Sequence, residues 1–443
     1  MYRRTEVLRI AGAARDDGPM PTTPDDDELD LIRRSGAALR AGRLSLAAGT
    51  GSYRVKASMA RLAHAMGVER HQAHVTLTEI TATSHRGLSF RTEVAEVRNV
   101  GINADRLARL ELMVTDVEQR SRQAEATPDE VEARLDDIEA VGPLYRPLLN
   151  ALWSGIACAA FAFLNNGGAV EVAGVFVAAS LGQAVRRALL HRGWNQFGVT
   201  MLAAAVACFT YLALVTALHG ADVITTRHEA GYVSAVLFLI PGFALVTGAL
   251  DLARLDFSAG VSRLTYALMI LTSAALAVWG VSSVVGLAPV PPAPLDLPTV
   301  LLWVLRALAS FAGVLGFALM FNSPWRMAVT AASVGAVANL ARLGLVDAGV
   351  AIQAAAAGAA LVVGLFAAYV APRIHVPRVT IAVPAVVIMV PGAAAYRAVF
   401  FLSEGQTVQA LAYGVQAALV VVALSIGLAV ARMLTDPTWG FER

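Results

Sequence analysis

Charged residues are scarce in this sequence. Asp, Glu, Lys and Arg make up 15% of its 443 residues, whereas they make up about a quarter of a soluble domain. They are concentrated in the first 146 residues, and the rest is mostly Ala, Val, Leu and Gly. The whole chain is 57% hydrophobic, with a mean hydropathy of +0.60. This distribution predicts a soluble N-terminal domain followed by a large integral membrane domain.

Cysteine is nearly absent, and the motifs of several enzyme classes are missing. The two cysteines, Cys158 and Cys208, lie in apolar segments and provide no disulfide or metal framework. There is no Walker motif, Gly-rich phosphate loop or nucleophile elbow, which argues against ATP-driven transport and against hydrolysis. His71 and His74 have metal-like spacing, but no Cys or carboxylate cluster lies beside them, so we interpret them as a surface pair in a helix or turn. We expect no enzyme activity, no cofactor and no metal site.

The N-terminal part should be a cytoplasmic domain. Residues 1–26 lack the long apolar core of a secretory signal and read as a disordered tail. The domain itself should span residues 27–146 and mix helices with strands. Its predicted helices are 27–47, 54–67, 102–123 and 128–140, and a β-rich stretch around a turn at residues 85–87 lies between the second and third. The net charge of +2 gives no indication of a nucleic-acid partner.

Ten segments of the remaining chain could cross a bilayer, which takes about 20 apolar residues. They are 148–165, 169–185, 197–218, 231–249, 262–285, 299–321, 327–343, 348–371, 380–401 and 406–432. Arginines gather in the loops after the second, fourth, sixth and eighth segments and near the C-terminus. Because cytoplasmic loops carry excess Lys and Arg, both termini are predicted on the cytoplasmic side of the inner membrane, including the tail 434–443.

Two of the ten segments carry Pro-Gly near their centres, at Pro241-Gly242 and Pro391-Gly392. Weaker similarities recur at a like offset, so the first module, residues 147–285, resembles the second, residues 299–433. A Pro-rich linker at 286–298 joins them. Each module has five spans, an odd number, so the two must lie upside down relative to each other. The predicted fold is therefore a mainly α-helical integral membrane protein with two inverted five-helix repeats and a soluble α+β domain.

The repeated helix breaks are the main indication of function. Inverted repeats with interrupted helices at matching positions are typical of transporters, whose substrates bind at the breaks near the membrane midplane. Pro241, Gly242, Pro391 and Gly392 are therefore predicted to contact the substrate. Alternatively, they are ordinary features of membrane helices, where neighbouring groups satisfy the freed backbone. If the breaks hold substrate, replacing either pair with Ala-Ala should abolish transport and leave stability unchanged or higher.

Three polar residues near the breaks, Asp251, Thr247 and Arg397, are further predicted to contact the substrate. Asp251 could receive a substrate ammonium group or a coupling proton, or be a capping or loop carboxylate paired with Arg254. Arg397 occupies the position of the second break that matches Thr247 after the first. It could meet a substrate carboxylate, or extend to the membrane interface.

Amide side chains also correspond across the modules. Asn166 pairs with Asn322 when the modules are aligned, and Gln183 falls near Asn339. Asn166 and Asn322 are predicted to contact substrate, although hydrogen bonding between helices would explain such amides without a ligand.

Three stretches resemble the threonine/serine exporter (ThrE-like) family. They are GTGSYRVKASMARLAHAMG at 49–67, FLIPGFALVTGALDLARLDFSAGVSRL at 238–264 and YVAPRIHVPRVTIAVPAVVIMVPG at 369–392. The family pattern in the middle stretch falls on Pro241, Gly242, Thr247, Asp251, Gly260 and Arg263. Thr247 stands where many members have Asn. The resemblance covers nearly everything from about Asp30 to the end, with both membrane modules in one chain.

The resemblance implies a secondary active exporter of small hydroxy amino acids in a bacterial inner membrane, working by proton antiport. Its partners would be threonine and serine, protons and the lipid bilayer, and a homo-oligomer is left open. Some bacteria split the modules into two chains associated with succinate export, so a dicarboxylate exporter is the alternative. A dicarboxylate site would need more cationic residues than the candidates provide, which favours amino acids. A non-transporting scaffold or channel is a third reading, against which the repeated breaks argue.

Overall fold

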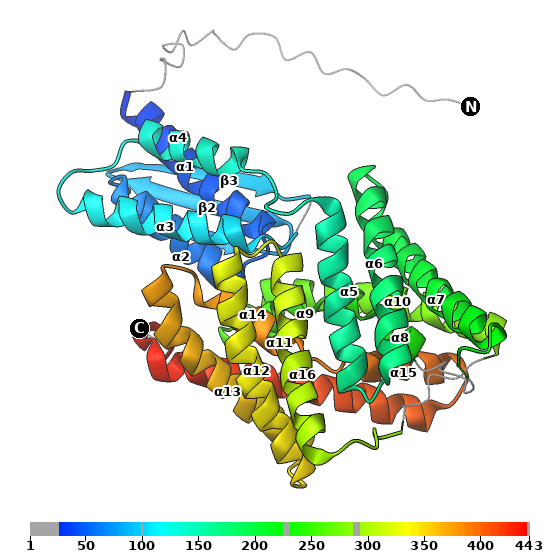
Figure 1. Cartoon of the computed structure of the whole chain (residues 1–443). Coiled ribbons are helices and arrows are strands. Elements are labelled where there is room, and N and C mark those ends of the chain that lie inside the picture. Colours follow the sequence, from blue (N-terminus) through cyan, green and yellow to red (C-terminus); the bar gives the residue numbers. More distant parts are fainter. Residues whose placement is uncertain (1–25, 99–100, 225–230, 287–292, 441–443) are drawn as a thin grey trace, which may run out of the picture.

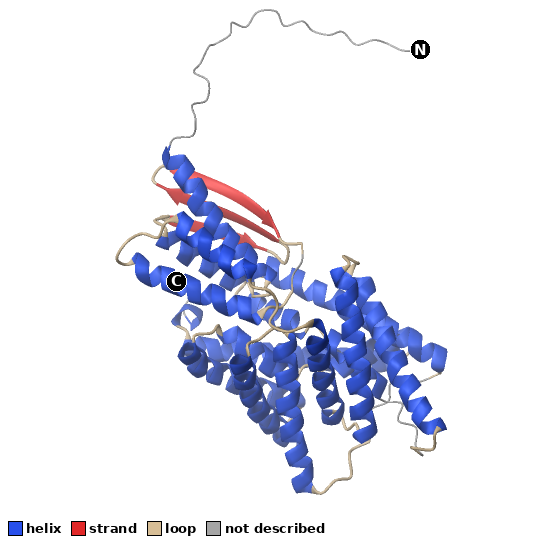
Figure 2. Cartoon of the chain, turned by 45° about the horizontal axis from the view of Figure 1, so that its top comes forward, coloured by secondary structure: helices blue, strands red, loops and turns tan. Residues whose placement is uncertain are grey.

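The computed structural model describes residues 26–98, 101–224, 231–286 and 293–440 (Figure 1). A small α/β domain covers one end of a larger bundle of helices (Figures 1 and 2). The predicted tail up to residue 25, most of the first half of the linker 286–298 and the last three residues lie outside the described residues.

The N-terminal domain packs four helices with one antiparallel sheet in the order β1-β2-β3. The elements are α1 (Asp26–Ala47), α2 (Ser52–Ala65), β1 (Arg70–Val75), β2 (Glu79–Arg86), β3 (Ser89–Glu96), α3 (Ala104–Ser121) and α4 (Pro128–Ala140). Side chains cap the N-termini of α3 and α4. The Asn103 side chain accepts from the backbone N–H of Arg106, and the Thr127 side chain accepts from the backbone N–H of Glu130. The four predicted helices and the β-rich middle are all present.

The histidine pair differs from its interpretation. His71 and His74 lie on β1, not in a helix or turn. Successive side chains of a strand alternate between its faces, so residues three apart point to opposite sides. His71 is buried and its Nδ1 lies 2.9 Å from Ser84 Oγ, whereas His74 is exposed. The two histidines therefore form neither a surface pair nor a metal pair.

Eight helices in the described part of the chain are long and apolar enough to cross a membrane. They are α5 (Pro147–Leu164), α6 (Ala169–His191), α7 (Gln196–Gly220), α10 (Phe257–Val285), α11 (Thr299–Met320), α12 (Trp325–Asp347), α13 (Ile352–Val370), which continues into the short helix η2 (Ala371–Ile374), and α16 (Thr407–Thr435). Helix α17 (Pro437–Gly440) ends the described chain.

The two segments with Pro-Gly form bent pairs of helices. In the first, α8 (Gly231–Ala235) and η1 (Leu237–Leu239) precede α9 (Gly242–Ala253) with a bend of 57°. In the second, α14 (Arg378–Val387) precedes α15 (Gly392–Ser403) with a bend of 54°. Counting each pair as one span gives up to ten spans, which correspond to the ten predicted segments.

The second half of the bundle repeats the first in helix order, and several helix lengths agree. Helices α6 and α12 each have 23 residues, α9 and α15 each have 12, and α10 and α16 each have 29. The backbone agrees at the breaks, where Pro241 has φ −79° and ψ 51° and Pro391 has φ −80° and ψ 58°. Asn166 and Asn322 both have positive φ, 66° and 61°.

The loops predicted to share one side of the membrane all lie against the N-terminal domain. Two of them line cavities together with residues of the domain, and three contact it directly. Trp194 lines a cavity with Leu77, Lys56 Nζ lies 2.6 Å from Asp256, Asn322 bonds Asn103, Pro377 lines a small cavity with Ser45, and Trp439 meets Tyr53 edge-on. These five segments therefore lie on one side of the bundle, and their placement in the cytoplasm stays a prediction.

Candidate functional site

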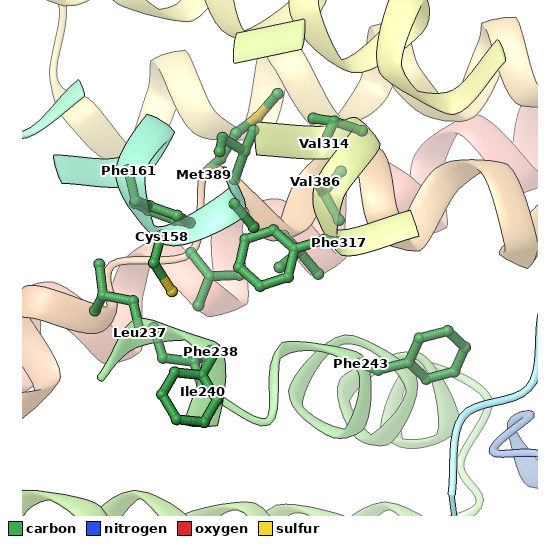
Figure 3. Close-up of a cluster of buried hydrophobic side chains, with 14 of the residues drawn as sticks. Cys158, Phe161, Leu237, Phe238, Ile240, Phe243, Val314, Phe317, Val386 and Met389 are labelled. Carbon is green, nitrogen blue, oxygen red and sulfur yellow. The ribbon is translucent and has the colours of Figure 1, made fainter. Parts of the chain in front are cut away.

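The two helix breaks pack against each other inside the bundle. A Cβ atom on Gly392 would lie 1.7 Å from Ile240 Cδ1, and one on Gly242 would lie 3.1 Å from Val387 Cγ2. The glycines thus let the two kinks approach more closely than residues with side chains would. Leu237, Ile240 and Val386 belong to one buried apolar cluster around the breaks (Figure 3).

The first break leaves polar backbone groups at the start of α9. Proline has no N–H, and Pro241 is the residue immediately before the helix. The N–H of Gly242 turns back to the carbonyl of Ile240 at 2.8 Å. No side chain in the described chain caps α9, so the first-turn N–H groups that follow, on Phe243 and Ala244, have no helical partner.

A cavity of about 640 Å³ reaches this break from the side of the N-terminal domain. Ile240, Pro241, Phe243 and Ala244 are the residues at the break that line it. Polar residues of the membrane helices line its walls: Asn150, Gln183, Arg186, Arg187, Arg263 and Tyr266. Residues of the N-terminal domain and the segment that leads from it line the cavity as well: Gly49, Leu77, Arg98, Gly101 and Ile102. The cavity therefore joins the first break to the N-terminal domain.

A directed chain of hydrogen bonds crosses the wall of the cavity. Asn150 Nδ2 donates to the carbonyl of Met320 at 2.9 Å, and Gln183 Nε2 donates to Asn150 Oδ1 at 2.9 Å. Gln183 is 3% exposed, and its Oε1 is buried with no hydrogen-bond partner in the described chain. Sequence reasoning treated Gln183 as a weak candidate and missed Asn150, although both are amides in apolar helices.

Arg186 was predicted only as part of the cytoplasmic positive charge, yet it lines the cavity one helical turn after Gln183. Its Nε is buried without a hydrogen-bond partner, and Arg186 forms no ion pair among the described residues. A cationic group is thus available at the cavity wall.

Asp251 lies behind the cavity in a buried ion pair. Its Oδ2 is 3.1 Å from Arg263 Nε, and Asp251 and Arg263 are 0% and 1% exposed. The same carboxylate accepts from the backbone N–H of Ser52 at 3.0 and 3.2 Å, at the start of α2. Arg263 also donates to the carbonyl of Thr50 at 2.7 Å. Of the two readings of Asp251, the structure shows a capping carboxylate, but its partner is Arg263 rather than Arg254.

Several other predicted residues do not line the cavity. Thr247 is buried and donates to the carbonyl of Phe243 at 2.8 Å, within its own helix. Asn322 binds the N-terminal region: its Nδ2 donates to Asn103 Oδ1 at 2.8 Å, and its Oδ1 accepts from the N–H of Leu144 at 2.8 Å. Asn166 ends α5 in a left-handed turn. Substrate contacts of these residues remain predictions.

The second break is also separate from the cavity. Neither Pro391 nor Gly392 lines it. Gly392 packs against Ile240, which does line the cavity. The Arg397 guanidinium lies 6.0 Å from the Tyr413 ring centre. The structure thus brings Pro241, and Asp251 through Arg263, to this site, and leaves Pro391, Gly392 and Arg397 apart from it.

Known families match both halves of the chain. Residues 37–285 match the family described as "Putative threonine/serine exporter", and residues 306–434 match "Threonine/Serine exporter, ThrE". The chain belongs to the threonine/serine exporter family. The predicted resemblance is confirmed, and this exporter is a mainly helical, multi-pass membrane protein.

Two curated relatives each match a little over half of the chain. The exporter is 26% identical over 252 residues to "Probable succinate transporter subunit YjjP" of Escherichia coli strain K12, covering 55% of this chain and 93% of that protein. It is 26% identical over 239 residues to the protein of the same name from Klebsiella aerogenes, covering 52% of this chain and 88% of the relative. No solved structure matches the exporter.

Proposed function

We propose that this protein is a secondary active exporter of threonine and serine, driven by the proton motive force. The observation that carries the proposal is the cavity that runs from the N-terminal domain to the first helix break. Both termini would face the cytoplasm of a bacterial cell, so the cavity would load substrate from inside. The arginine-bearing loops on the side of the N-terminal domain support this orientation.

The start of α9 suits a substrate carboxylate. The uncapped N–H groups of Phe243 and Ala244 belong to residues that line the cavity. A helix N-terminus carries a partial positive charge and favours bound anions. The break at Pro241-Gly242 would place these groups at the cavity wall, and broken helices of transporters bind substrate at such breaks.

The two modules would act as inverted repeats that alternate access to the site. Matching helix lengths, matching backbone angles at the breaks and five spans in each module support this arrangement. Rocking one module against the other would close the observed cavity and open one on the far side. The substrate would then meet the second break, including Pro391, Gly392 and Arg397, with Asn166 on that side of the bundle.

Asp251 is the candidate for proton coupling. A proton on its carboxylate would remove the charge that pairs with Arg263 and would weaken the cap on α2. Proton binding would thereby loosen the N-terminal domain from the end of the cavity that it lines. The domain would then act as a gate rather than only as a scaffold.

Export of small dicarboxylates is the second candidate. Two observations favour it. The relatives are named succinate transporter subunits, and four arginines line the cavity: Arg98, Arg186, Arg187 and Arg263. Arg263 is already paired with Asp251, which reduces the charge available to a second carboxylate.

Efflux from proteoliposomes tests the proposal. Vesicles containing the full-length protein would be loaded with labelled threonine, serine, alanine or succinate, with and without a proton gradient. We expect gradient-dependent efflux of threonine and serine that exceeds efflux of succinate. Efflux of succinate alone would assign the second function instead, and equal leakage of every solute would indicate a channel.

A further inference from the structure

The orientation of one buried amide defines the chemistry of the cavity wall. The carbonyl of Met320 can only accept a hydrogen bond, so Asn150 must turn its NH₂ group toward it. This leaves Asn150 Oδ1 to accept, and Gln183 must supply an NH₂ hydrogen to it. The oxygen of Gln183 is therefore the end of the chain that remains unpaired.

An unpaired buried oxygen of this kind calls for a donor. A buried acceptor without a partner has lost its hydrogen bonds to water without replacement, so native structures rarely keep one. Gln183 is 3% exposed and lines the cavity. A ligand with a hydrogen-bond donor would satisfy its Oε1, and a charged donor would bind it best. A carboxylate could not, because it has only acceptors at neutral pH.

The positive groups of the cavity lie beside this acceptor. Arg186 follows Gln183 by three residues on α6, which places their Cβ atoms about 5–6 Å apart on one face of the helix. The uncapped start of α9 lines the same cavity. In an α-amino acid the ammonium and carboxylate groups are attached to one carbon atom. An acceptor beside cationic and N–H groups matches that pair of opposite charges.

We infer that Gln183 receives the ammonium group of the substrate and makes the site prefer α-amino acids to dicarboxylates. The inference rests on the proposed function and names the residue that selects the substrate class. Asn150 is a positioning residue, which holds the Gln183 amide with its oxygen toward the ligand. A dicarboxylate would instead place a carboxylate oxygen, which only accepts, against Gln183 Oε1, which also only accepts.

Equilibrium binding to the full-length protein in lipid nanodiscs tests this role. Isothermal titration would compare threonine, 3-hydroxybutyrate, a hydroxy acid that is threonine with hydrogen in place of the ammonium group and so has no donor at that carbon, and succinate. The wild-type protein should bind threonine about tenfold to a hundredfold more tightly than either of the others. The variant Gln183→Met has a side chain of similar length without the acceptor. It should lose most of this preference and bind the hydroxy acid as the wild type does.

The matched control is Gln353→Met, on a half-buried glutamine of α13 that does not line the cavity. It should leave all three affinities unchanged. Equal wild-type affinity for threonine and the hydroxy acid would overturn the inference without any variant. Equal weakening of both ligands in Gln183→Met would also overturn it, because Gln183 would then only shape the site. If the wild type exports succinate and not threonine, the proposed function itself is wrong. If the wild type exports threonine and Gln183→Met has the same three affinities as the wild type, the proposed function stands and only the role of Gln183 is wrong.

Discussion

Asp251 on α9 caps helix α2 of the N-terminal domain, because its carboxylate accepts from the backbone N–H of Ser52 at 3.0 and 3.2 Å. Gly51, the residue before the helix, has no side chain to do so. A membrane helix thus completes a helix of the soluble domain. A change in the charge of Asp251 should therefore affect both the membrane helix α9 and helix α2 of the N-terminal domain.

Replacing Asp251 should remove the coupling of efflux to the proton gradient without abolishing transport. In Asp251→Asn the amide oxygen still caps α2, since Asn is a good capping residue, but Arg263 loses its counter-charge. Breaking a buried pair costs about 3–5 kcal/mol, so the melting temperature should fall. Efflux should no longer respond to a proton gradient, while threonine exchange between equal pools should persist.

Two further variants separate the effects on stability and on coupling. Asp251→Asn combined with Arg263→Met removes both charges and should recover part of the stability without recovering coupling. Asp347→Asn, which breaks an exposed pair with Arg306, should cost about 0–1 kcal/mol and leave coupling intact. Normal gradient dependence in Asp251→Asn would show that another group carries the proton.

Restoring the backbone donor at each break should impair transport. Pro241→Ala and Pro391→Ala each remove a residue that disfavours helix by about 3 kcal/mol relative to Ala. A straighter helix would draw the free backbone groups into its own hydrogen bonds. We expect threonine efflux to fall by an order of magnitude or more in both variants, with the melting temperature equal or higher. Wild-type efflux in both would mean that the breaks serve packing alone.

Replacing Gly392 with Ala should lower the stability of the protein far more than replacing Gly242 with Ala. This differs from the expectation that an Ala-Ala replacement leaves stability unchanged or higher at either break. The new Cβ of Gly392→Ala would lie 1.7 Å from Ile240 Cδ1. Overpacking of this kind costs about 1–3 kcal/mol. Gly242→Ala, with its nearest atom at 3.1 Å, should cost less. Adding Ile240→Val, which lacks Cδ1, should restore the melting temperature of Gly392→Ala, and failure to do so would place the strain elsewhere.

His71 should make the stability of the N-terminal domain sensitive to acid. Burial, with a smaller effect of nearby His64, lowers the pKa of His71 from its ordinary 6.5 to about 4. The unfolded chain therefore binds a proton at a pH where the folded domain does not. The stability that depends on neutral His71 is complete above pH 6.5 and is lost as the pH falls toward 4, about 3 kcal/mol in all.

The variant His71→Asn should flatten this dependence, because Asn can keep the hydrogen bond to Ser84 and cannot titrate. Melting temperatures of the full-length protein at pH 7.5 and pH 5 would measure it. His74→Asn, on the exposed face of the same strand, is the control and should behave as the wild type. An unchanged acid sensitivity in His71→Asn would assign the effect to other groups.

The membrane orientation can be checked directly. Reporter fusions near residues 190, 255 and 375 should report the cytoplasm, and fusions within the linker 286–298 should report the outside. A cytoplasmic signal from the linker would mean that the spans have been miscounted and that the modules are not inverted.

Much of the architecture follows from local properties of the sequence. The limits of the helices depend on apolar length and on capping residues, both of which are local. Residues 128–140 were predicted as a helix and form α4 with the same limits, because Thr127 and Pro128 define its start. The β-rich stretch before the turn at residues 85–87 is not a single strand. It divides into β1 and β2, since the N–H of Thr76 donates to the carbonyl of Glu79 at 2.9 Å and reverses the chain between them.

The sequence by itself determined the candidate spans and the two breaks, because each depends on residues close together along the chain. Only the tertiary structure decided which polar groups meet. The partner expected for Asp251 was Arg254, three residues away, but α9 and α10 pack together and bring Arg263 to it. Ser52 reaches the same carboxylate across 199 residues of sequence. Likewise, the Gln183 oxygen is left without a partner in the described chain because its NH₂ group donates to Asn150, whose own NH₂ group donates to the carbonyl of Met320. Most buried polar groups have a partner, and helix packing rather than distance along the chain decides which one.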